Sequence, residues 1–222
     1  MDIFLDLDGT LLDVSKRHYS VYCDILTDLN RSPLPFAQYW ALKRAGTSLR
    51  DILAESGAGD LVDSFRQAWL KLIERRRYLE MDTVADHTRQ TLHRLRQDHR
   101  LILVTLRQSS ESLIQELESL SLREVFEAIL AAGPAGAAAA VKARLIEAYK
   151  AAPSGWLAGD TELDVQTARA VGLRSCAVTW GLRSRSFLEA VHPDAVADDV
   201  RAIPNIVTAP RPERLARHGT RR

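Results

Sequence analysis

Cysteine is scarce in this chain of 222 residues, which has only Cys23 and Cys176. Two cysteines without metal-type Cys/His spacing form neither a disulfide framework nor a thiolate metal motif. We expect both to be small buried side chains. An excess of one charge is also missing, because 30 Lys and Arg stand against 29 Asp and Glu. A net charge of +1 gives no bulk electrostatic reason to expect a nucleic-acid partner.

Long hydrophobic runs are absent as well. No stretch approaches the roughly 20 apolar residues needed to cross a bilayer, so no membrane association is predicted. The first residues, Met1 to Asp6, lack the basic start and apolar stretch of a secretory signal. We therefore expect a soluble, cytoplasmic protein.

The basic residues that are present gather at the end of the chain. Five Arg and a single acidic residue, Glu213, lie between residues 211 and 222. Such a segment is typical of a solvated, disordered tail, which we place at residues 209–222. A nucleic-acid-binding arm is the alternative, and it would rest on this tail alone.

Hydrophobic residues make up 46% of the chain and charged residues 27%, which is ordinary for a globular protein. Short apolar runs alternate with stretches of helical spacing, and this alternation predicts an α/β fold with a Rossmann-like, mainly parallel sheet. The expected strands are Ile3–Leu7, Leu101–Thr105, Ala128–Ala131, Gly155–Ala158, Ser175–Thr179 and Ala195–Ala197.

One region interrupts the alternation. Between Leu12 and about Asp86 only helical patterns occur, with Pro and Gly between them. We predict an all-helical domain of residues 14–86 inserted into an α/β core of residues 1–13 and 87–208. Two helix faces should form the core of the insert: Tyr19, Tyr22, Cys23, Leu26 and Leu29 on one, and Leu61, Phe65, Trp69, Leu72 and Ile73 on the other.

Asp6 and Asp8 end the first expected strand. Residues two apart on a strand point to the same face, so both carboxylates should lie at its carboxyl end, where open α/β sheets bind ligands. Neighbouring carboxylates repel unless a cation or proton intervenes, and a hard divalent cation such as Mg²⁺ suits such a pair. An isolated Asp-x-Asp is more often a pair of solvated turn residues.

Other polar residues follow later strands. Thr105 ends a buried strand and could hold a phosphate oxygen with its hydroxyl, although Thr often ends strands for local reasons. Lys142 lies in a helix after the third strand and could supply positive charge, although most such lysines are solvated. Asp160 and Asp164 follow another strand and open a helix, where capping would explain one of them but does not require both.

Together these residues resemble the haloacid dehalogenase-like phosphatase family. Asp6-Leu7-Asp8-Gly9-Thr10 matches its Asp-x-Asp-Gly-Thr motif, and Gly159, Asp160 and Asp164 match its Gly-Asp-x-x-x-Asp motif. Thr105 and Lys142 resemble its strand-end Ser/Thr and its lysine. The similarity runs from Asp6 to about Gly181, and the helical insert resembles the family's small helical cap.

The resemblance implies a Mg²⁺-dependent phosphatase in which Asp6 becomes phosphorylated and Asp8 acts as general acid and base. Mg²⁺ would be held by Asp6, the Asp8 backbone carbonyl and Asp160, with Asp164 supporting the site through water or through Lys142. Thr105 and Lys142 would bind the phosphoryl oxygens. The predicted partner is a small phosphorylated metabolite, and the protein is expected to be a monomer or homodimer.

The cap should choose the substrate, and Lys43, Arg44 and Arg50 could contact an anionic one. Each could equally lie on a solvated helix face. A phosphoglycolate-like or sugar phosphate substrate is expected. The alternatives are phosphoryl transfer like that of β-phosphoglucomutase and a non-catalytic protein that binds a phosphate ligand on the same scaffold. A phosphonate hydrolase is disfavoured, because neither Lys16 nor Lys43 has a context that favours a lowered pKa.

Overall fold

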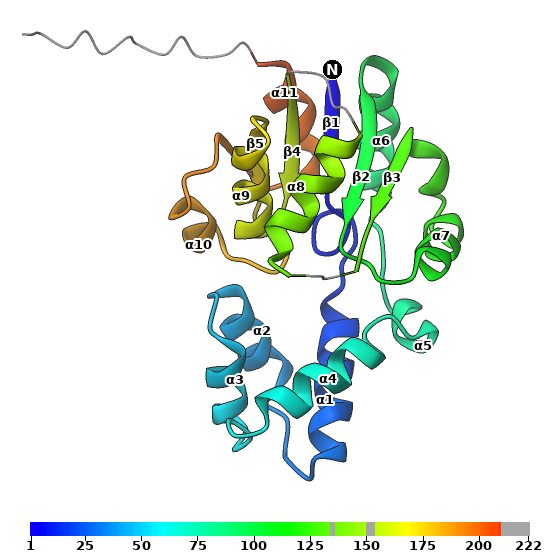
Figure 1. Ribbon diagram of the computed structural model, residues 1–222. Helices are drawn as coiled ribbons and strands as arrows, with labels where there is room; N and C mark the ends of the chain where they lie inside the picture. Colours follow the sequence, from blue (N-terminus) through cyan, green and yellow to red (C-terminus); the bar gives the residue numbers. More distant parts are fainter. Residues whose placement is uncertain (134–135, 150–153, 210–222) are drawn as a thin grey trace, which may run out of the picture.

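The computed structural model describes residues 1–133, 136–149 and 154–209. Six strands form one parallel sheet in the order β3-β2-β1-β4-β5-β6 (Figure 1). They are β1 (Asp2–Leu5), β2 (Arg100–Thr105), β3 (Ala128–Ala131), β4 (Gly155–Gly159), β5 (Arg174–Val178) and β6 (Ala195–Ala197). Each predicted strand corresponds to one of these, so the predicted α/β fold with a parallel sheet is confirmed.

The first strand is shorter than its apolar pattern predicts. Asp6 still donates its N–H to the carbonyl of Ala158 at 3.0 Å, but the chain then turns. The carbonyl of Leu7 accepts the N–H groups of Leu11 at 2.9 Å and Leu12 at 3.1 Å, which closes a tight loop. Asp6 and Asp8 therefore lie where the chain leaves the sheet.

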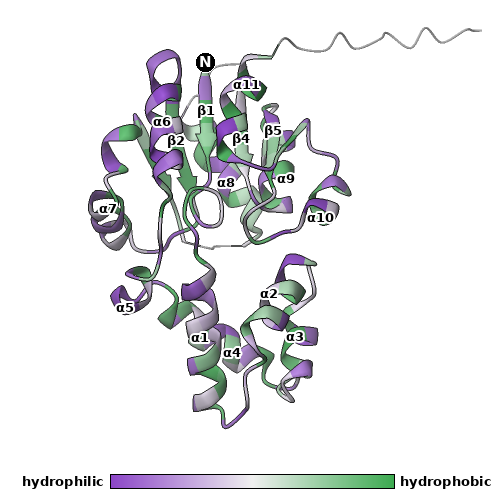
Figure 2. Ribbon diagram, turned by 180° about the vertical axis from the view of Figure 1, so that it is seen from behind, coloured by the Kyte–Doolittle hydropathy of each residue, from purple (hydrophilic) through white to green (hydrophobic). Residues whose placement is uncertain are grey.

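Helices cover both faces of the sheet because alternate strand residues point to opposite sides. Ile3 and Leu5 belong to a core that includes residues of α6 (Asp86–Asp98), α7 (Ser110–Ser119) and α11 (Ile203–Thr208). Phe4 belongs to the opposite core, with residues of α8 (Ala138–Ala148) and α9 (Glu162–Ala170). In Figure 2 the central strands are mainly hydrophobic, as burial on both faces requires.

The inserted segment forms a separate helical lobe at the carboxyl ends of the strands (Figure 1). Its helices are α1 (Ser15–Asp28), α2 (Phe36–Arg44), α3 (Leu49–Glu55), α4 (Val62–Leu72) and α5 (Arg76–Leu79). Both predicted apolar faces contribute to its core, in which the rings of Tyr22 and Tyr39 stack 4.2 Å apart. We refer to this lobe as the cap.

The chain enters and leaves the cap at adjacent points. The N–H of Asp13 donates to the carbonyl of Thr83 at 2.8 Å, and the N–H of Thr83 donates back at 3.3 Å. This two-residue bridge joins the outgoing and returning segments, and we propose residues 14–86 as the extent of the cap.

Three short helices complete the fold of the described residues. A short helix, α10 (Arg185–Glu189), follows β5, and two 3-10 helices lie at Arg123–Val125 and Val200–Ala202. Within the described parts of the chain, no helix has the length and apolar character needed to span a membrane. Residues 210–222 of the predicted basic tail lie outside the described residues.

Candidate active site

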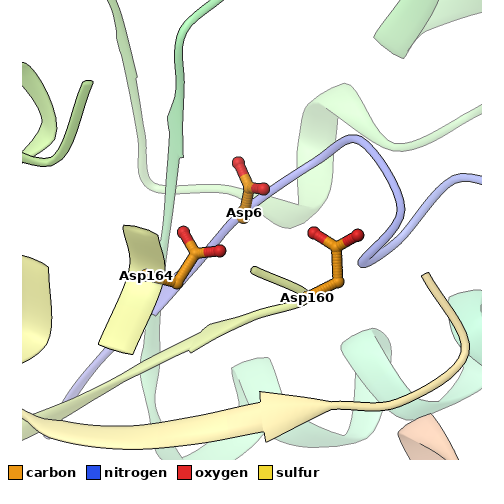
Figure 3. A group of neighbouring side chains, drawn as sticks. All are labelled: Asp6, Asp160 and Asp164. Carbon is orange, nitrogen blue, oxygen red and sulfur yellow. The ribbon is translucent and has the colours of Figure 1, made fainter. Parts of the chain in front are cut away.

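Three carboxylates converge at the carboxyl edge of the sheet (Figure 3). Asp6 follows β1, Asp160 follows β4, and Asp164 lies in the first turn of α9. Each offers an oxygen within 4.8 Å of an oxygen of the others. The exposed fractions are 7% for Asp6, 0% for Asp160 and 1% for Asp164. The order of the strands thus brings together residues that lie more than 150 positions apart.

Lys142 from α8 neutralises part of this charge. Its Nζ lies 2.7 Å from Oδ1 of Asp6 and 2.7 Å from Oδ1 of Asp164. Burial alone would lower the pKa of Lys142, but Asp164 and Asp6 raise it above its usual value. The lysine therefore remains protonated in contact with both carboxylates.

The remaining negative charge leaves the site suited to a cation. Burial raises the pKa of Asp6 to about 7, against the opposing effect of Lys142. Burial, followed by the charges of Asp6 and Asp164, raises the pKa of Asp160 well above its usual value. Carboxylates this close and this buried need either protons or a cation between them.

Small residues and backbone groups fix the position of Asp160. The N–H of Leu182 donates to Oδ2 of Asp160 at 2.6 Å, and the Thr10 hydroxyl donates to Oδ1 at 3.3 Å. Gly9 has φ +78°, and a Cβ there would lie 2.1 Å from Oδ2 of Asp160. A Cβ on Gly181 would lie 2.2 Å from the same oxygen. Glycine at both positions lets two loops close tightly around this carboxylate.

Asp164 is already occupied by contacts within the protein. Its Oδ2 accepts the backbone N–H of Thr161 at 3.1 Å and the Thr161 hydroxyl at 2.8 Å, which forms a capping box at the start of α9. Its Oδ1 accepts Lys142. Of the two supporting roles predicted for Asp164, the geometry favours the one through Lys142.

Asp8 lies in a different electrostatic environment from Asp6. Arg107 binds it through two nitrogens, Nε to Oδ2 at 2.8 Å and Nη2 to Oδ1 at 2.7 Å. Nη2 of Arg17, from α1 of the cap, lies 2.6 Å from Oδ1. Burial favours the neutral carboxyl, but the two guanidinium groups hold the pKa of Asp8 well below its usual range.

The same arginines bind two more buried acids. Nε of Arg17 lies 3.0 Å from Asp82, and Nη2 of Arg107 lies 3.4 Å from Asp82 and 3.1 Å from Glu116. Burial raises the pKa of Asp82 to about 8 and also raises that of Glu116. Two arginines and three acids thus form one buried network where the cap joins the core.

No role was predicted from the sequence for Arg17, Arg107, Asp82 or Glu116. One signal was available, because Arg107 is only two residues beyond Thr105 and therefore lies at the same strand end. Nothing in the spacing of Arg17, Asp82 and Glu116 indicates that they meet. Thr105, which was predicted, is 2% exposed at the end of β2, the strand next to β1.

Of the cap residues predicted to contact substrate, Lys43 is placed most favourably. Its Nζ lies 5.3 Å from the ring centroid of Trp69 and 5.8 Å from that of Tyr39. Burial, then the charge of Arg183, lowers the pKa of Lys43 to about 8, while Asp160 opposes the shift. A lowered pKa of Lys43 was not expected from its sequence context, so that part of the argument against a phosphonate hydrolase was wrong.

His18 lies beside Lys43 in the cap but was not predicted. Its ring is 5.2 Å from that of Trp69, it is 8% exposed, and its Nδ1 has no hydrogen-bond partner within the described structure. Burial, with the charges of Lys43 and Arg17, holds the pKa of His18 well below its usual value. A neutral histidine with a free ring nitrogen is suited to a hydrogen bond with a ligand.

The two predicted cap arginines lie elsewhere. Arg44 directs its guanidinium to backbone carbonyls of the loop after β5: Nη2 to Thr179 at 2.7 Å, and Nη1 to Trp180 at 3.1 Å and Gly181 at 3.0 Å. Arg50 is exposed on α3, and its Nη1 donates to the carbonyl of Gly59 at 3.3 Å.

The residues present fit a divalent cation. Their donors are carboxylate oxygens, the ligands that Mg²⁺ prefers, and one of them, Asp160, is fully buried, with its pKa raised by that burial and by neighbouring carboxylates. Within the described part of the chain this is the one such group of His, Cys, Asp and Glu. The site can therefore present a nucleophilic carboxylate, a cation and a lysine to one phosphate.

Comparison with known proteins agrees with this chemistry. Residues 3–178 match the family model described as haloacid dehalogenase-like hydrolase. The chain is 22% identical over 214 residues to pyrophosphatase PpaX of Oceanobacillus iheyensis, covering 92% of this chain and 95% of that protein. It is 25% identical over 210 residues to a phosphoglycolate phosphatase of Rhodobacter capsulatus, with coverage of 92% and 95%.

Solved structures support the fold. A haloacid dehalogenase-like hydrolase from Streptococcus pneumoniae superposes with a TM-score of 0.76 at 22% identity, covering 92% of this chain and 97% of the other. The family match spans both sequence motifs and most of the core and cap. This chain belongs to the haloacid dehalogenase-like hydrolase family, and the predicted family and enzyme class are confirmed.

Proposed function

We propose that the chain is a Mg²⁺-dependent phosphatase that hydrolyses a small phosphomonoester through an aspartyl-phosphate on Asp6. The observation that carries the proposal is the convergence of Asp6 with Asp160, Asp164 and Lys142 at the carboxyl end of the central strand. A nucleophile, a cation site and a lysine that can bind phosphate meet there, as two-step phosphoryl transfer requires.

In the first step a carboxylate oxygen of Asp6 attacks phosphorus, and the ester P–O bond breaks. The leaving oxygen carries the electron pair away and takes a proton from Asp8 or from solvent. Lys142, already 2.7 Å from Asp6, would move its hydrogen bond to a phosphoryl oxygen. Thr105, at the end of the adjacent strand, would bind another.

In the second step water attacks phosphorus of the aspartyl-phosphate, Asp8 accepts a proton from that water, and the carboxylate of Asp6 is restored. The ion pairs with Arg17 and Arg107 keep Asp8 ionised, which suits its role as base. Asp6, the Asp8 carbonyl and Asp160 would hold Mg²⁺, which neutralises repulsion between the carboxylate and the phosphate.

The ionised state of Asp8 affects which leaving groups the substrate can have. A carboxylate held by two guanidinium groups is a poor general acid, so leaving groups that need little protonation should react faster than simple alkoxides. Inorganic pyrophosphate, on which the PpaX relative is named to act, has such a leaving group. It is the second candidate substrate, beside a phosphoglycolate-like or sugar phosphate ester.

The cap supplies the groups that would recognise the rest of the substrate. Lys43 and His18 lie together beside Trp69, one cationic and one with a free ring nitrogen. This pair favours an anionic group such as a carboxylate or a second phosphate. Phosphoryl transfer to a bound sugar, and phosphate binding without catalysis, remain the alternatives.

The test is phosphate release by the purified chain from a panel that includes phosphoglycolate, sugar phosphates and pyrophosphate, with and without Mg²⁺. Asp6→Asn should lower kcat by about a thousandfold or more, because amides are poor nucleophiles towards phosphorus. Arg66→Ala, a change at an exposed arginine of the cap, is the control and should leave kcat unchanged.

Acid trapping of protein-bound phosphate gives an independent reading. A burst of Mg²⁺-dependent labelling that Asp6→Asn removes would support the covalent intermediate. Turnover without labelling, or equal turnover by the Asp6→Asn variant, would contradict the proposed mechanism. Labelling followed by transfer to a sugar instead of water would favour the mutase alternative.

A further inference from the structure

The side chain of Arg44, a cap residue, binds three consecutive carbonyls of the core, those of Thr179, Trp180 and Gly181. These contacts use the guanidinium of Arg44 and turn it towards the loop after β5. This arrangement calls for a role other than substrate binding.

The loop that Arg44 holds is the loop that positions Asp160. Leu182 donates its N–H to Oδ2 of Asp160 at 2.6 Å. Gly181 packs so closely that a Cβ would lie 2.2 Å from the same oxygen and 2.3 Å from the Gly9 carbonyl. Trp180 Nε1 donates to the carbonyl of Thr10 at 2.9 Å. Residues 179–182 therefore lie between Arg44 on one side and Asp160 on the other.

Neighbouring contacts seat the end of α2 on the same loop. The N–H of Ser184 donates to the Arg44 carbonyl at 2.8 Å, and Nη1 of Arg183 donates to the Lys43 carbonyl at 3.1 Å. Gly46 has φ +76°, and a Cβ there would lie 2.1 Å from the Phe187 ring. The cap backbone thus approaches the core as closely as a glycine allows.

The Arg44 contacts join the cap to the core, so they exist only while the cap rests on this loop. Separation would break the Arg44 contacts and release residues 179–182 on that side. Closure would restore them.

We infer that Arg44 is a positioning residue that couples closure of the cap to the orientation of Asp160, and thereby to Mg²⁺ affinity. The inference rests on the Mg²⁺ site of the proposed function, but it concerns binding of the ion and not turnover. Mutation of a side chain that orients a metal ligand commonly lowers metal affinity by about 10- to 100-fold.

Isothermal titration of the full chain with Mg²⁺, in the absence of substrate, tests this role. Arg44→Ala should weaken Mg²⁺ binding by about tenfold or more. Arg44→Lys, which keeps the charge but cannot reach three carbonyls, should give an intermediate affinity. Arg66→Ala, which removes an exposed arginine of the same cap, is the matched control and should bind Mg²⁺ as the wild type does.

A second pair of variants disturbs the same contact without removing a charge. Gly46→Ala and Gly57→Ala both place a side chain at positive φ in the cap, but a Cβ at Gly57 has no atom within 4 Å. Only Gly46→Ala should weaken Mg²⁺ binding. Circular dichroism and thermal unfolding establish whether each variant is folded. If Arg44→Ala does not fold, the comparison of Gly46→Ala with Gly57→Ala still tests the inference.

The outcomes separate this inference from the proposed function. Wild-type Mg²⁺ affinity in both Arg44→Ala and Gly46→Ala would overturn the inference, and a raised KM alone in Arg44→Ala would make Arg44 a substrate contact instead. Weakened Mg²⁺ binding in a chain without phosphatase activity would support the inference while the proposed function fails. A wild-type chain that does not bind Mg²⁺ would overturn both.

Discussion

At the scale of single residues, two aspartates of one motif have opposite electrostatics. Asp6 shares its surroundings with Asp160 and Asp164, and burial raises its pKa to about 7. Asp8, two positions later, is bound by Arg17 and Arg107, which hold its pKa below the usual range. Divergent environments of this kind allow two carboxylates to take different chemical roles.

The raised pKa values predict how Mg²⁺ binding depends on pH. In the ion-free protein Asp6 and Asp160 bind protons more tightly than usual, and Mg²⁺ must displace them. Affinity should therefore rise with pH through the region around pH 7, by up to about tenfold per pH unit for each displaced proton. Mg²⁺ titrations at several pH values measure this dependence. An affinity that does not change between pH 6 and 8 would contradict the prediction.

Arg107 provides a second prediction for a single side chain. It is 3% exposed and binds Asp8 through two nitrogens, with Asp82 and Glu116 also in contact. Lysine cannot reproduce the planar, two-nitrogen contact. Arg107→Lys should lower the free energy of unfolding by about 2–4 kcal/mol, since buried acids lose a partner.

Urea denaturation measures that change, and Arg76→Lys is the control. Arg76 pairs with Glu80 at 2.8 Å, but its side chain is 90% exposed. Exposed pairs contribute little, so the control should change stability by less than about 0.5 kcal/mol. Equal effects of the two substitutions would show that the buried network does not need a guanidinium group.

At the scale of elements, the site depends on loops that close at strand ends. β1 and β4 are neighbours, so their carboxyl ends bring Asp6 and Asp160 together. The loop after β5 reaches back over Asp160, and α9 begins with the capping box that fixes Asp164. Three short segments, each anchored by a buried strand, therefore bring the three carboxylates together and hold them in place.

Gly181→Ala tests the tight approach of the loop after β5. A Cβ would fall 2.2 Å from Oδ2 of Asp160 and 2.3 Å from the Gly9 carbonyl, so the loop or Asp160 must shift. We expect Mg²⁺ affinity and kcat to fall by about tenfold or more, as misplaced groups at such sites commonly cause.

The control for this substitution is Gly172→Ala. Gly172 has φ +73° at the end of α9, but a Cβ there meets no atom within 4 Å. A side chain in this left-handed conformation is strained, so Gly172→Ala should lower the free energy of unfolding of the protein by about 1–2 kcal/mol without changing the Mg²⁺ site. The steric argument fails if Gly181→Ala binds Mg²⁺ as tightly as Gly172→Ala does.

At the scale of the whole molecule, the network of Arg17, Arg107, Asp8, Asp82 and Glu116 joins cap, core and connecting segments. Arg17 also donates to the carbonyl of Ile73 at 3.2 Å, near the end of α4. The joint between the two domains is therefore polar, and its charges depend on pH.

This joint predicts a pH-dependent stability. The pKa of Asp82 is about 8 in the folded protein and 3.8 for the unperturbed group, so between these values the native state holds a proton that the unfolded state has lost. Stability from this group is present below about pH 4 and is lost as pH rises towards 8. Over this range the free energy of unfolding should fall by at most about 1.4 kcal/mol per pH unit because of this group.

Urea unfolding at several pH values measures the slope, and Asp82→Asn should flatten it because the amide cannot lose the proton. Asp86→Asn is the control, since the side chain of Asp86 is 91% exposed. An unchanged slope in Asp82→Asn would assign the proton to another group of the network.

The sequence by itself determined the sheet and most of the candidate site. Buried parallel strands appear as short apolar runs, and residues that follow such strands must gather at one edge. Asp6, Thr105 and Asp160 were therefore predictable in their places, as was the apolar core of the helical insert, while Lys142 was assigned through the family resemblance. These features depend on local periodicity and on the general geometry of parallel sheets.

Only the tertiary structure decided how the cap meets the core. Arg44 finds its carbonyl partners about 135 positions away, and Arg17 meets Asp82 at a distance of 65 positions. No local pattern encodes such contacts, because they follow from docking one folded domain against another. For the same reason the sequence predicted a cluster of carboxylates but not the arginines that hold Asp8, or the loop contacts that fix Asp160.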